Sequence, residues 1–391
     1  MSGSKKILPF KIDIPKTELD DLHARLKRTR WPDELPGVEG NYGVPIDYIK
    51  RLVAHWLDGY DWRKHEAELN QYPQFTTDID GQKIHFLHVR SPEPNALPLI
   101  LTHGWPGSVV EYLDIIGPLS DPRAHGGDPD QAFHLVIPSL PGFGFSGPTH
   151  ETGWNRHRTA AALAELMKRL GYKRYGAVGN DAGSMINPEL GRIDPKHVIG
   201  LHVTQIFSFP SGDPAEMADL SPEEQRELET LQSFSKNKLS FNTLMSQQPQ
   251  TLAFALSDSP VGLLAWNAQL FGDDFDDDFV LTNVMLYWLT GTAASAARFY
   301  YEDAHATPPS GQTTVPIGLA AFAGDFSGIR RFADRDHQNI VRWSTFDHGG
   351  HFAAHKVPDL LVGDVRAFFG SLRAMPPAKS DAPSTHPRDS V

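Results

Sequence analysis

A carboxylate stands where a strand-to-helix turn would present a nucleophile. Residues 179–183 read Gly-Asn-Asp-Ala-Gly and follow the apolar run 175–178, which is the small-x-nucleophile-x-small pattern of a nucleophile elbow. The central residue is Asp181, where enzymes that form acyl intermediates have serine. A carboxylate that is ionised at neutral pH is suited to displace a leaving group from an electrophilic alkyl carbon. The pattern therefore favours epoxides or haloalkanes as substrates over carboxylic esters.

An aspartate and a histidine follow later strands in the order that such a nucleophile requires, which is nucleophile, acid, histidine. Asp325 comes after the apolar run 315–322, and His351 comes after two glycines beyond the run 340–343. Each residue alone would ordinarily be a turn former or a satisfied surface or core side chain. Their joint order at three predicted strand ends favours a catalytic triad of Asp181, Asp325 and His351.

Two backbone amides are the predicted donors of an oxyanion hole. Residues 103–108 read His-Gly-Trp-Pro-Gly-Ser and follow the apolar run 97–101. Pro106 has no N–H, so the amides of Trp105 and Ala182 are the expected donors. We also expect a cis Trp105–Pro106 peptide bond. The alternative for this segment is a purely structural turn rich in glycine and proline.

The elements that must position these residues alternate between short apolar runs and helical patterns such as 160–170. The apolar runs are 97–101, 133–137, 175–179, 198–203, 315–322 and 340–343. Such alternation is typical of a parallel sheet with helices on both faces. The predicted fold class is therefore α/β, with a mostly parallel sheet flanked by helices and interrupted by a helical cap.

Five segments are expected along the chain. They are an N-terminal helical and meander extension (1–96), a first part of the α/β core (97–205), a helical cap (206–312), a second part of the core (313–373) and a disordered tail (374–391). Within the extension, helices are predicted from Pro15 and over 46–57. A strand pair is predicted to turn at Asp80 and Gly81. In the cap, Ser221 and Glu224 form a capping-box pattern.

Composition excludes several kinds of protein. Lys and Arg number 36 against 48 Asp and Glu, a formal net charge of -12, which disfavours a nucleic-acid partner. The 391 residues contain no cysteine, which excludes disulfides, thiol catalysis and zinc–thiolate sites. The first residues lack an apolar stretch for a signal or membrane anchor, so we expect a soluble cytoplasmic protein. The sequence leaves a homodimer open.

Three further motifs are interpreted without a cofactor or metal. Gly142–Gly147 matches a dinucleotide-binding spacing, but Pro148 and the next residues do not open a helix. The acidic run 273–278 lacks the glycine and distal glutamate of an EF-hand, so a solvated loop is expected. Two glycines interrupt the histidines of 347–355, which disfavours metal ligands at helical spacing.

With these motifs in hand, the chain resembles the epoxide hydrolases of the microsomal and juvenile-hormone type, which have an α/β-hydrolase fold. The resemblance covers about residues 12 to 369. The segments that carry it include Thr-Arg-Trp-Pro at 29–32, Tyr-Asp-Trp-Arg-Lys at 60–64, the motifs at 103–108 and 138–146, Leu-Thr-Asn-Val-Met-Leu-Tyr-Trp at 281–288, Arg-Phe-Tyr at 298–300 and Gly-Gly-His-Phe-Ala-Ala at 349–354. The resemblance implies a soluble bacterial-type member without the membrane anchor of animal members.

The resemblance also implies an activity: conversion of an apolar small-molecule epoxide and water to a vicinal diol, without a cofactor. Asp181 would attack a ring carbon to give an alkyl-enzyme ester, while Tyr300 donates a hydrogen bond to the departing oxygen. His351, oriented by Asp325, would then activate water to cleave that ester. The substrate, its enantiomer, and a role in detoxification or in biosynthesis are left open.

Two positions depart from the family pattern. A second family tyrosine should lie eight residues before Pro249, where this chain has Phe241. The family elbow usually carries tryptophan after the aspartate, where this chain has Ala182. Two alternatives to an active epoxide hydrolase stay open. One is a haloalkane-type dehalogenase, which Ala182 disfavours because such enzymes have tryptophan there to hold the halide; the other is a weakly catalytic α/β-hydrolase that binds a hydrophobic ligand.

Overall fold

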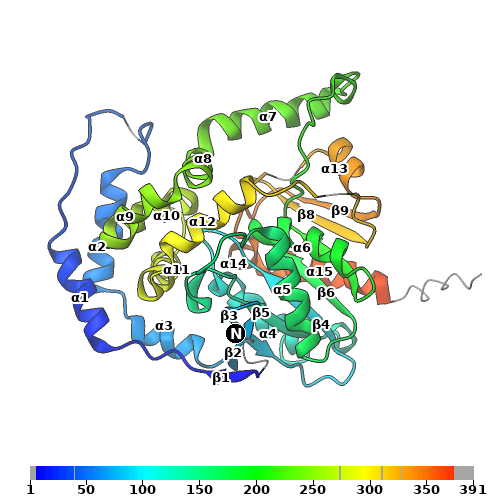
Figure 1. Cartoon of the computed structure of the whole chain (residues 1–391), viewed down its shortest axis with the longest axis horizontal. Coiled ribbons are helices and arrows are strands. Elements are labelled where there is room, and N and C mark those ends of the chain that lie inside the picture. Colours follow the sequence, from blue (N-terminus) through cyan, green and yellow to red (C-terminus); the bar gives the residue numbers. More distant parts are fainter. Residues whose placement is uncertain (1–5, 39, 273, 310, 327, 374–391) are drawn as a thin grey trace, which may run out of the picture.

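A computed structural model describes residues 6–38, 40–272, 274–309, 311–326 and 328–373. Within these residues one nine-stranded sheet has the strand order β1-β2-β3-β5-β4-β6-β7-β8-β9. Helices cover the sheet, and a further group of helices stands over one end of it (Figure 1). The expected tail at 374–391 lies outside the described residues, so its predicted disorder stays a prediction.

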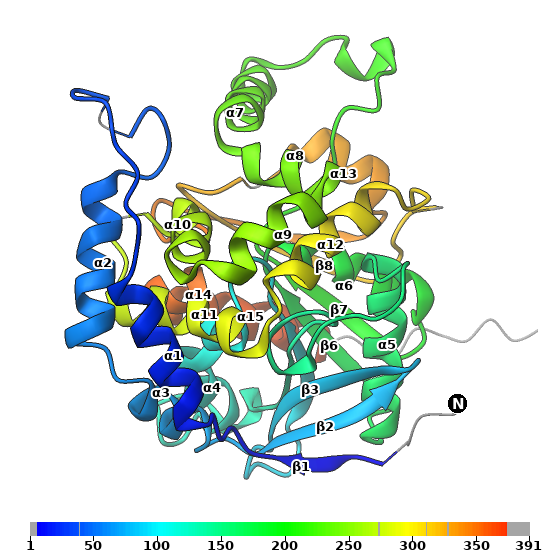
Figure 2. The ribbon, with the colours of Figure 1, turned by 60° about the vertical axis from the view of Figure 1, so that its left-hand side comes forward.

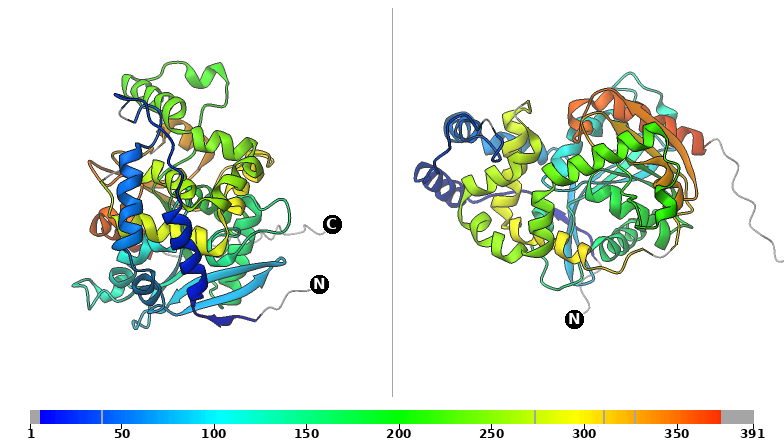
Figure 3. Two further views of the ribbon diagram at one scale, coloured as in Figure 1. Left: turned by 90° about the vertical axis from the view of Figure 1, so that its left-hand side faces the viewer. Right: turned by 90° about the horizontal axis from the view of Figure 1, so that it is seen from above.

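Six strands make up the parallel part of the sheet: β4 (Leu97–Thr102), β5 (Phe133–Pro138), β6 (Tyr175–Gly179), β7 (Val198–Val203), β8 (Ile317–Phe322) and β9 (Ile340–Phe346). Helices α5 (Arg156–Arg169) and α6 (Ala182–Ile193) lie on one face (Figure 3). The other face carries α4 (Leu113–Ser120), α14 (Ala353–Lys356) and α15 (Pro358–Arg373). Because both faces are covered, β5 to β8 are apolar and almost fully buried. The predicted α/β class and mostly parallel sheet are confirmed.

Three antiparallel strands form one edge: β1 (Leu8–Phe10), β2 (Gln74–Ile79) and β3 (Gln82–Val89). The β2–β3 turn is at Asp80 and Gly81, as expected, with φ of 55° and 74°. Positive φ at both central residues gives the backbone twist that a two-residue hairpin favours. Strand β3 pairs with β5, so the sheet runs across the predicted boundary at residues 96 and 97. The division into five segments stays a prediction.

The N-terminal helices lie beside the cap rather than on the sheet (Figures 2 and 3). They are α1 (Lys16–Lys27), α2 (Ile46–Asp58) and α3 (Trp62–Leu69), and the first two confirm the helices expected from apolar spacing. Helix α2 turns its buried residues Leu52, Val53 and Trp56 inward and contacts α10 and α11 of the cap. The extension therefore supports the helices that stand over the sheet.

Between β7 and β8 the chain forms helices α7 (Pro222–Lys238), α8 (Ser240–Gln247), α9 (Pro249–Asp258), α10 (Pro260–Phe271), α11 (Asp277–Thr290) and α12 (Ala293–Ala304). Ser221 caps α7 and Glu224 returns the hydrogen bond, which confirms the capping box. Helix α7 projects away from the sheet (Figure 1), whereas α12 packs against α8 and α9. The shorter elements are α13 (Arg330–Asp336) and 3-10 helices at Val109–Tyr112, Pro129–Gln131, Gly144–Ser146 and Pro214–Met217.

The acidic run that leads into the first turn of α11 has partners, which corrects the expectation of a solvated loop. Asp276 caps α11 by accepting from the Phe279 amide at 2.9 Å. Asp277 pairs with Arg51 at 2.6 Å, and Asp278 lies 2.7 Å from His55 Nε2. These partners belong to α2, 226 and 223 positions away in sequence, so no local pattern could indicate them. Asp273 lies outside the described residues.

Candidate active site

Asp181 lies at the sharp turn between β6 and α6, with φ of 51° and ψ of -119°. This conformation is strained for a residue with a side chain. The turn also needs glycine beside it, because a Cβ on Gly183 would come within 1.8 Å of the Thr102 carbonyl oxygen. A Cβ on Gly104 would meet Asp181 Oδ1 at 2.0 Å. The small residues of both motifs therefore let the backbone approach the carboxylate closely.

The structure brings together the three residues of the expected triad. His351 Nδ1 lies 3.1 Å from Asp325 Oδ2, and His351 Nε2 lies 3.8 Å from Asp181 Oδ2. The Gly350 amide donates to the Ala323 carbonyl at 3.1 Å, which ties the loop after β9 to the loop after β8. Asp325 and His351 therefore meet because their strands are neighbours in the sheet.

Both predicted amide donors face the nucleophile carboxylate. The Trp105 N–H donates to Asp181 Oδ1 at 2.9 Å, and the Ala182 N–H also donates to Asp181. The Trp105–Pro106 bond is cis, as expected. Both amides therefore contact the Asp181 carboxylate, and Oδ2 of the same carboxylate lies near His351.

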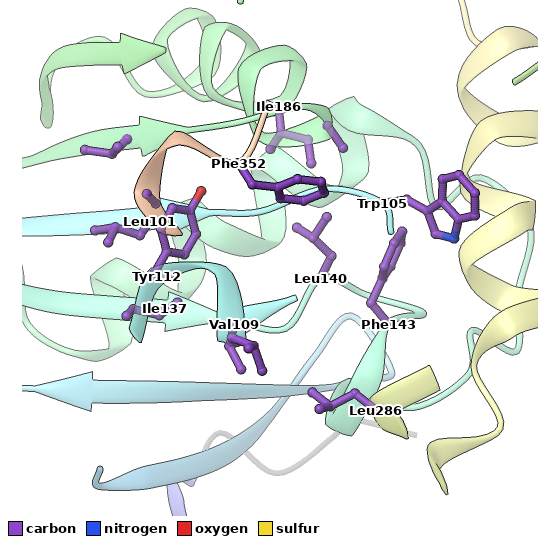
Figure 4. Close-up of a cluster of buried hydrophobic side chains, with 14 of the residues drawn as sticks. Leu101, Trp105, Val109, Tyr112, Ile137, Leu140, Phe143, Ile186, Leu286 and Phe352 are labelled. Carbon is purple, nitrogen blue, oxygen red and sulfur yellow. The ribbon is translucent and has the colours of Figure 1, made fainter. Parts of the chain in front are cut away.

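Aromatic rings from the cap close over the site. Trp105 stacks on Phe241 of α8 with ring centres 5.1 Å apart, and Tyr300 of α12 meets both rings edge-on at 6.2 and 6.1 Å. Trp105 stands beside a helix in the yellow of the cap, while Leu140 and Phe143 lie toward the sheet (Figure 4). Tyr287 is different, because its hydroxyl donates to the Gly107 carbonyl at 2.7 Å. This hydroxyl is therefore engaged with the loop that follows β4.

The charges of the site alter its proton affinities. Burial raises the pKa of Asp181, although His351 and the Trp105 and Ala182 amides oppose the rise. Burial lowers the pKa of His351, but the carboxylates of Asp325, Asp181 and Glu111 outweigh it and raise that pKa to about 9. Burial, followed by the charge of Asp181, raises the pKa of Tyr300 well above its ordinary value. Tyr300 is therefore a protonated hydrogen-bond donor at neutral pH.

A polar network that was not predicted from the sequence lies behind the triad. Gln205 accepts from the Asp181 amide at 2.9 Å and donates to Asp325 and to Asn180 Oδ1. Asn180 in turn donates to Glu111 at 2.8 Å. Gln205 follows the predicted strand 198–203, so its place at the carboxyl edge of the sheet was a usable signal. No comparable signal indicates Glu111, because it lies in a 3-10 helix and not at the end of a strand.

The motifs interpreted without a cofactor have protein partners. The Gly144 amide donates to Thr292 of the cap at 3.1 Å, and Gly142 accepts from Ser295. His355 lies 2.7 Å from Asp114. Across the part of the chain that the structure describes, no three histidine or acidic side chains gather as metal ligands would.

Two family models match the chain. One is described as the epoxide hydrolase N terminus and covers residues 7–112. The other is described as the alpha/beta hydrolase fold and covers residues 98–242. Among the helices of the described ranges, none combines the length and apolar character that crossing a membrane requires.

Several known proteins are similar over nearly the whole chain. A protein of Stigmatella aurantiaca with a provisional epoxide hydrolase name is 44% identical, with 94% of this chain and 86% of that protein covered. Epoxide hydrolase 1 of Sus scrofa is 34% identical, with 94% and 89% covered. Juvenile hormone epoxide hydrolase from Bombyx mori has a TM-score of 0.86 at 27% identity, with 95% and 96% covered. Aspergillus niger epoxide hydrolase has a TM-score of 0.82 at 30% identity, with 95% and 98% covered.

Proposed function

The chain belongs to the epoxide hydrolase family and has its α/β-hydrolase fold, and from that premise we propose how it opens an epoxide. The substrate is an apolar small-molecule epoxide, and the product is a vicinal diol formed through an ester on Asp181. The observation that carries the proposal is the carboxylate itself: Oδ1 accepts the Trp105 amide at 2.9 Å, while Oδ2 lies 3.8 Å from His351 Nε2.

In the first step, Asp181 Oδ2 attacks a ring carbon of the epoxide, and the bond from that carbon to the ring oxygen breaks. The oxygen leaves as an alkoxide, which is a poor leaving group near neutral pH unless an acid is present. Tyr300 is the protonated donor at this position, since burial keeps its pKa high. It gives its proton to the alkoxide and recovers one from solvent later.

In the second step, His351 Nε2 takes a proton from water, and the oxygen of that water attacks Cγ of the Asp181 ester. The negative charge develops on Oδ1, which already accepts from the Trp105 amide, while the Ala182 amide donates to the same carboxylate, and such preorganised donors lower the barrier. The intermediate collapses, the alkyl oxygen leaves with the proton from His351, and the acid left on Asp181 gives its remaining proton to solvent, which restores the carboxylate. Asp325 orients His351 and stabilises its charged form.

The surroundings of the site favour an uncharged, apolar substrate. Trp105, Phe241 and Tyr300 present rings above the nucleophile, and aromatic walls bind apolar molecules with a few directed polar contacts. The chemistry uses only amino-acid side chains, the epoxide and water, so the proposal includes no cofactor. A cytoplasmic location, a homodimer and a role in detoxification stay predictions.

The proposal is tested by trapping the ester. His351→Gln protein is mixed with styrene oxide, quenched, digested and analysed by mass spectrometry. We expect an adduct on Asp181 that persists, because the base for the second step is gone. Asp181→Asn is the control and forms no adduct, once intact mass excludes deamidation to aspartate.

Other outcomes would contradict the proposal. Release of chloride or bromide from haloalkanes without diol formation from epoxides indicates a dehalogenase. Absence of an ester with every aliphatic and aromatic epoxide in a panel indicates a protein that binds a hydrophobic ligand without catalysis.

A further inference from the structure

Glu111 is a buried carboxylate beside the triad that the two steps above do not use. It lies in the 3-10 helix Val109–Tyr112 and is only 1% exposed. Its Oε1 accepts from Asn180 Nδ2 at 2.8 Å. Among the described residues, its Oε2 has no hydrogen-bond partner. A buried carboxylate oxygen without a partner costs free energy, so this atom needs an explanation.

A second unpartnered atom lies in the same place. His351 Nε2 is buried and has no hydrogen-bond partner among the described residues, and it is the atom that must meet the hydrolytic water. Glu111 and His351 line one narrow gap together with Asn180 and Thr204, and a water molecule enters it only if these side chains move apart. Glu111 Oε2 also lies against the loop that carries the Trp105 amide, since a Cβ on Gly107 would be 2.7 Å from it.

We propose that Glu111 binds the hydrolytic water: its Oε2 accepts one O–H of the water while His351 Nε2 takes the other proton. The inference rests on the ester mechanism proposed above. The water forms one bond, to Cγ of Asp181, and loses one proton, to His351. During this step Glu111 stays a carboxylate and neither gains nor loses a covalent bond.

Asn180 fixes the orientation of this carboxylate. Its Oδ1 accepts from Thr204 Oγ1 at 2.7 Å and from Gln205 Nε2 at 2.8 Å. The Gln205 NH₂ group can only donate, so it requires the Asn180 amide to keep its oxygen there and to present its NH₂ group to Glu111. Turning the amide over would lose these bonds and leave the Glu111 oxygen facing another oxygen. The residue before the nucleophile thus contributes to the second step.

Formation of the ester changes the charges in the direction that this role needs. Burial, followed by the charges of Asp181 and Asp325, raises the pKa of Glu111 to about 8, against Asn180 and His351. Asp181 also raises the pKa of His351. Esterification removes the charge of Asp181 and with it one contribution that raises both pKa values. This change favours an ionised Glu111 that can accept from water and a neutral His351 that can take a proton.

The test separates the two half-reactions. Wild type and Glu111→Gln are mixed with styrene oxide in a single turnover, and quenched samples are analysed by intact mass for the ester. The glutamine keeps an amide oxygen that can accept from Asn180. Its NH₂ group then takes the place of Oε2, so the water meets a donor instead of an acceptor. We expect the ester to form at the wild-type rate and to decay about 100-fold more slowly, as for a misplaced reactant.

Asn180→Ala provides a second variant that keeps the carboxylate. It should also slow decay of the ester, by about tenfold, without slowing its formation. Glu189→Gln is the matched control, because Glu189 is a buried acid that pairs with His157 and Arg192. It should lower the unfolding temperature and leave both rates unchanged.

Specific results would overturn the inference. If the ester decays in Glu111→Gln and Asn180→Ala as fast as in wild type, Glu111 does not bind the hydrolytic water. Equal slowing of formation and decay, with a lower unfolding temperature, indicates a structural role instead. If Glu111→Gln does not fold, the Asn180→Ala rates decide. Absence of an ester in His351→Gln as well contradicts the proposed function rather than this inference.

Discussion

At the scale of single residues, the two oxygens of Asp181 have different partners. Oδ1 accepts the Trp105 amide, whereas Oδ2 is the oxygen closer to His351. The Trp105 amide therefore stabilises the oxygen on which negative charge develops in the second step. Oδ2 is left as the oxygen that forms the ester in the first step. One residue thus serves as nucleophile and then as the electrophilic centre that water attacks.

The pH dependence of ester decay follows from His351. Its pKa in the free enzyme is about 9, and loss of the Asp181 charge lowers it in the ester. His351 must be neutral to act as the base, so the rate of ester decay should rise with pH. It should level off at a pH below about 9, which is the pKa of His351 in the free enzyme. Rapid-quench mass spectrometry of the ester over a pH series measures this. A decay rate that falls as pH rises would contradict the assignment of His351 as the base.

Phe241 offers a direct test of the acid in ring opening. Its ring lies 5.1 Å from that of Trp105 and 6.1 Å from that of Tyr300, where a hydroxyl would supply a second donor. We expect Phe241→Tyr to speed ester formation from an aliphatic epoxide by about tenfold, the effect of one hydrogen bond to a charged group.

Tyr300→Phe is the matched change in the opposite direction. It should slow ester formation by about 100-fold, the usual range for a general acid, and leave ester decay unchanged. If neither substitution changes the rate of ester formation, the departing oxygen does not lie between these two rings.

At the residue scale, the sequence predicted those site residues whose reactive side chains also stand at the ends of predicted strands. Asp181, Asp325 and His351 were predicted to meet because the carboxyl ends of parallel strands share one edge, and the structure brings them together. Glu111 could not be predicted, because its burial and its contact with Asn180, which is 69 positions away, arise only in the folded chain. Neither property is encoded in local spacing.

At the scale of elements, the acidic start of α11 fastens the N-terminal helices to the cap. Burial tends to raise the pKa of Asp278, but His55, His65 and Lys64 outweigh it and lower that pKa. We expect Asp278→Asn to weaken this contact by about 1 kcal/mol, typical of a partly exposed ion-pair network. Faster hydrogen exchange in α2 and α3 would show the change.

A control isolates this contact from a general loss of charge. Asp258→Asn removes an exposed carboxylate that lies 3.4 Å from Arg25, and it should leave exchange in α2 and α3 unchanged. Equal exchange in both variants and wild type would mean that Asp278 does not anchor the extension.

Local elements were the easiest part of the fold to predict. The Asp80-Gly81 turn and the capping box at Ser221 depend on neighbouring residues alone, and both are present. The acidic run was misinterpreted because Arg51 and His55 lie more than 200 positions away. The strand order, in which β5 lies between β3 and β4, likewise depends on contacts between distant segments.

At the scale of the whole molecule, Asp364 joins the end of the chain to the sheet. It is buried on α15 and accepts from His202 of β7 at 2.8 Å and from Arg342 and Ser344 of β9 at 2.8 and 2.7 Å. Burial alone would raise the pKa of Asp364, but these bonds outweigh it and lower that pKa. Removing the charge leaves His202 and Arg342 without their partner.

We expect Asp364→Asn to lower the free energy of unfolding by about 3 kcal/mol at neutral pH, as when one member of a buried pair is lost. A lowered pKa contributes stability above the unfolded value of about 3.9 and loses it as pH falls. The difference from wild type should therefore shrink in acid. Urea unfolding at several pH values measures it, with the exposed Asp334→Asn as control. A difference that grows in acid would contradict the assignment.

The mechanism requires that water attacks an enzyme ester and not the epoxide. A single turnover of epoxide by excess unlabelled enzyme in water enriched in oxygen-18 distinguishes the two. We expect the heavy oxygen to enter the Asp181 carboxylate, where it is found in the peptide that contains residue 181, and the first diol to be unlabelled. Heavy oxygen in the first diol, with an unlabelled Asp181, would contradict it.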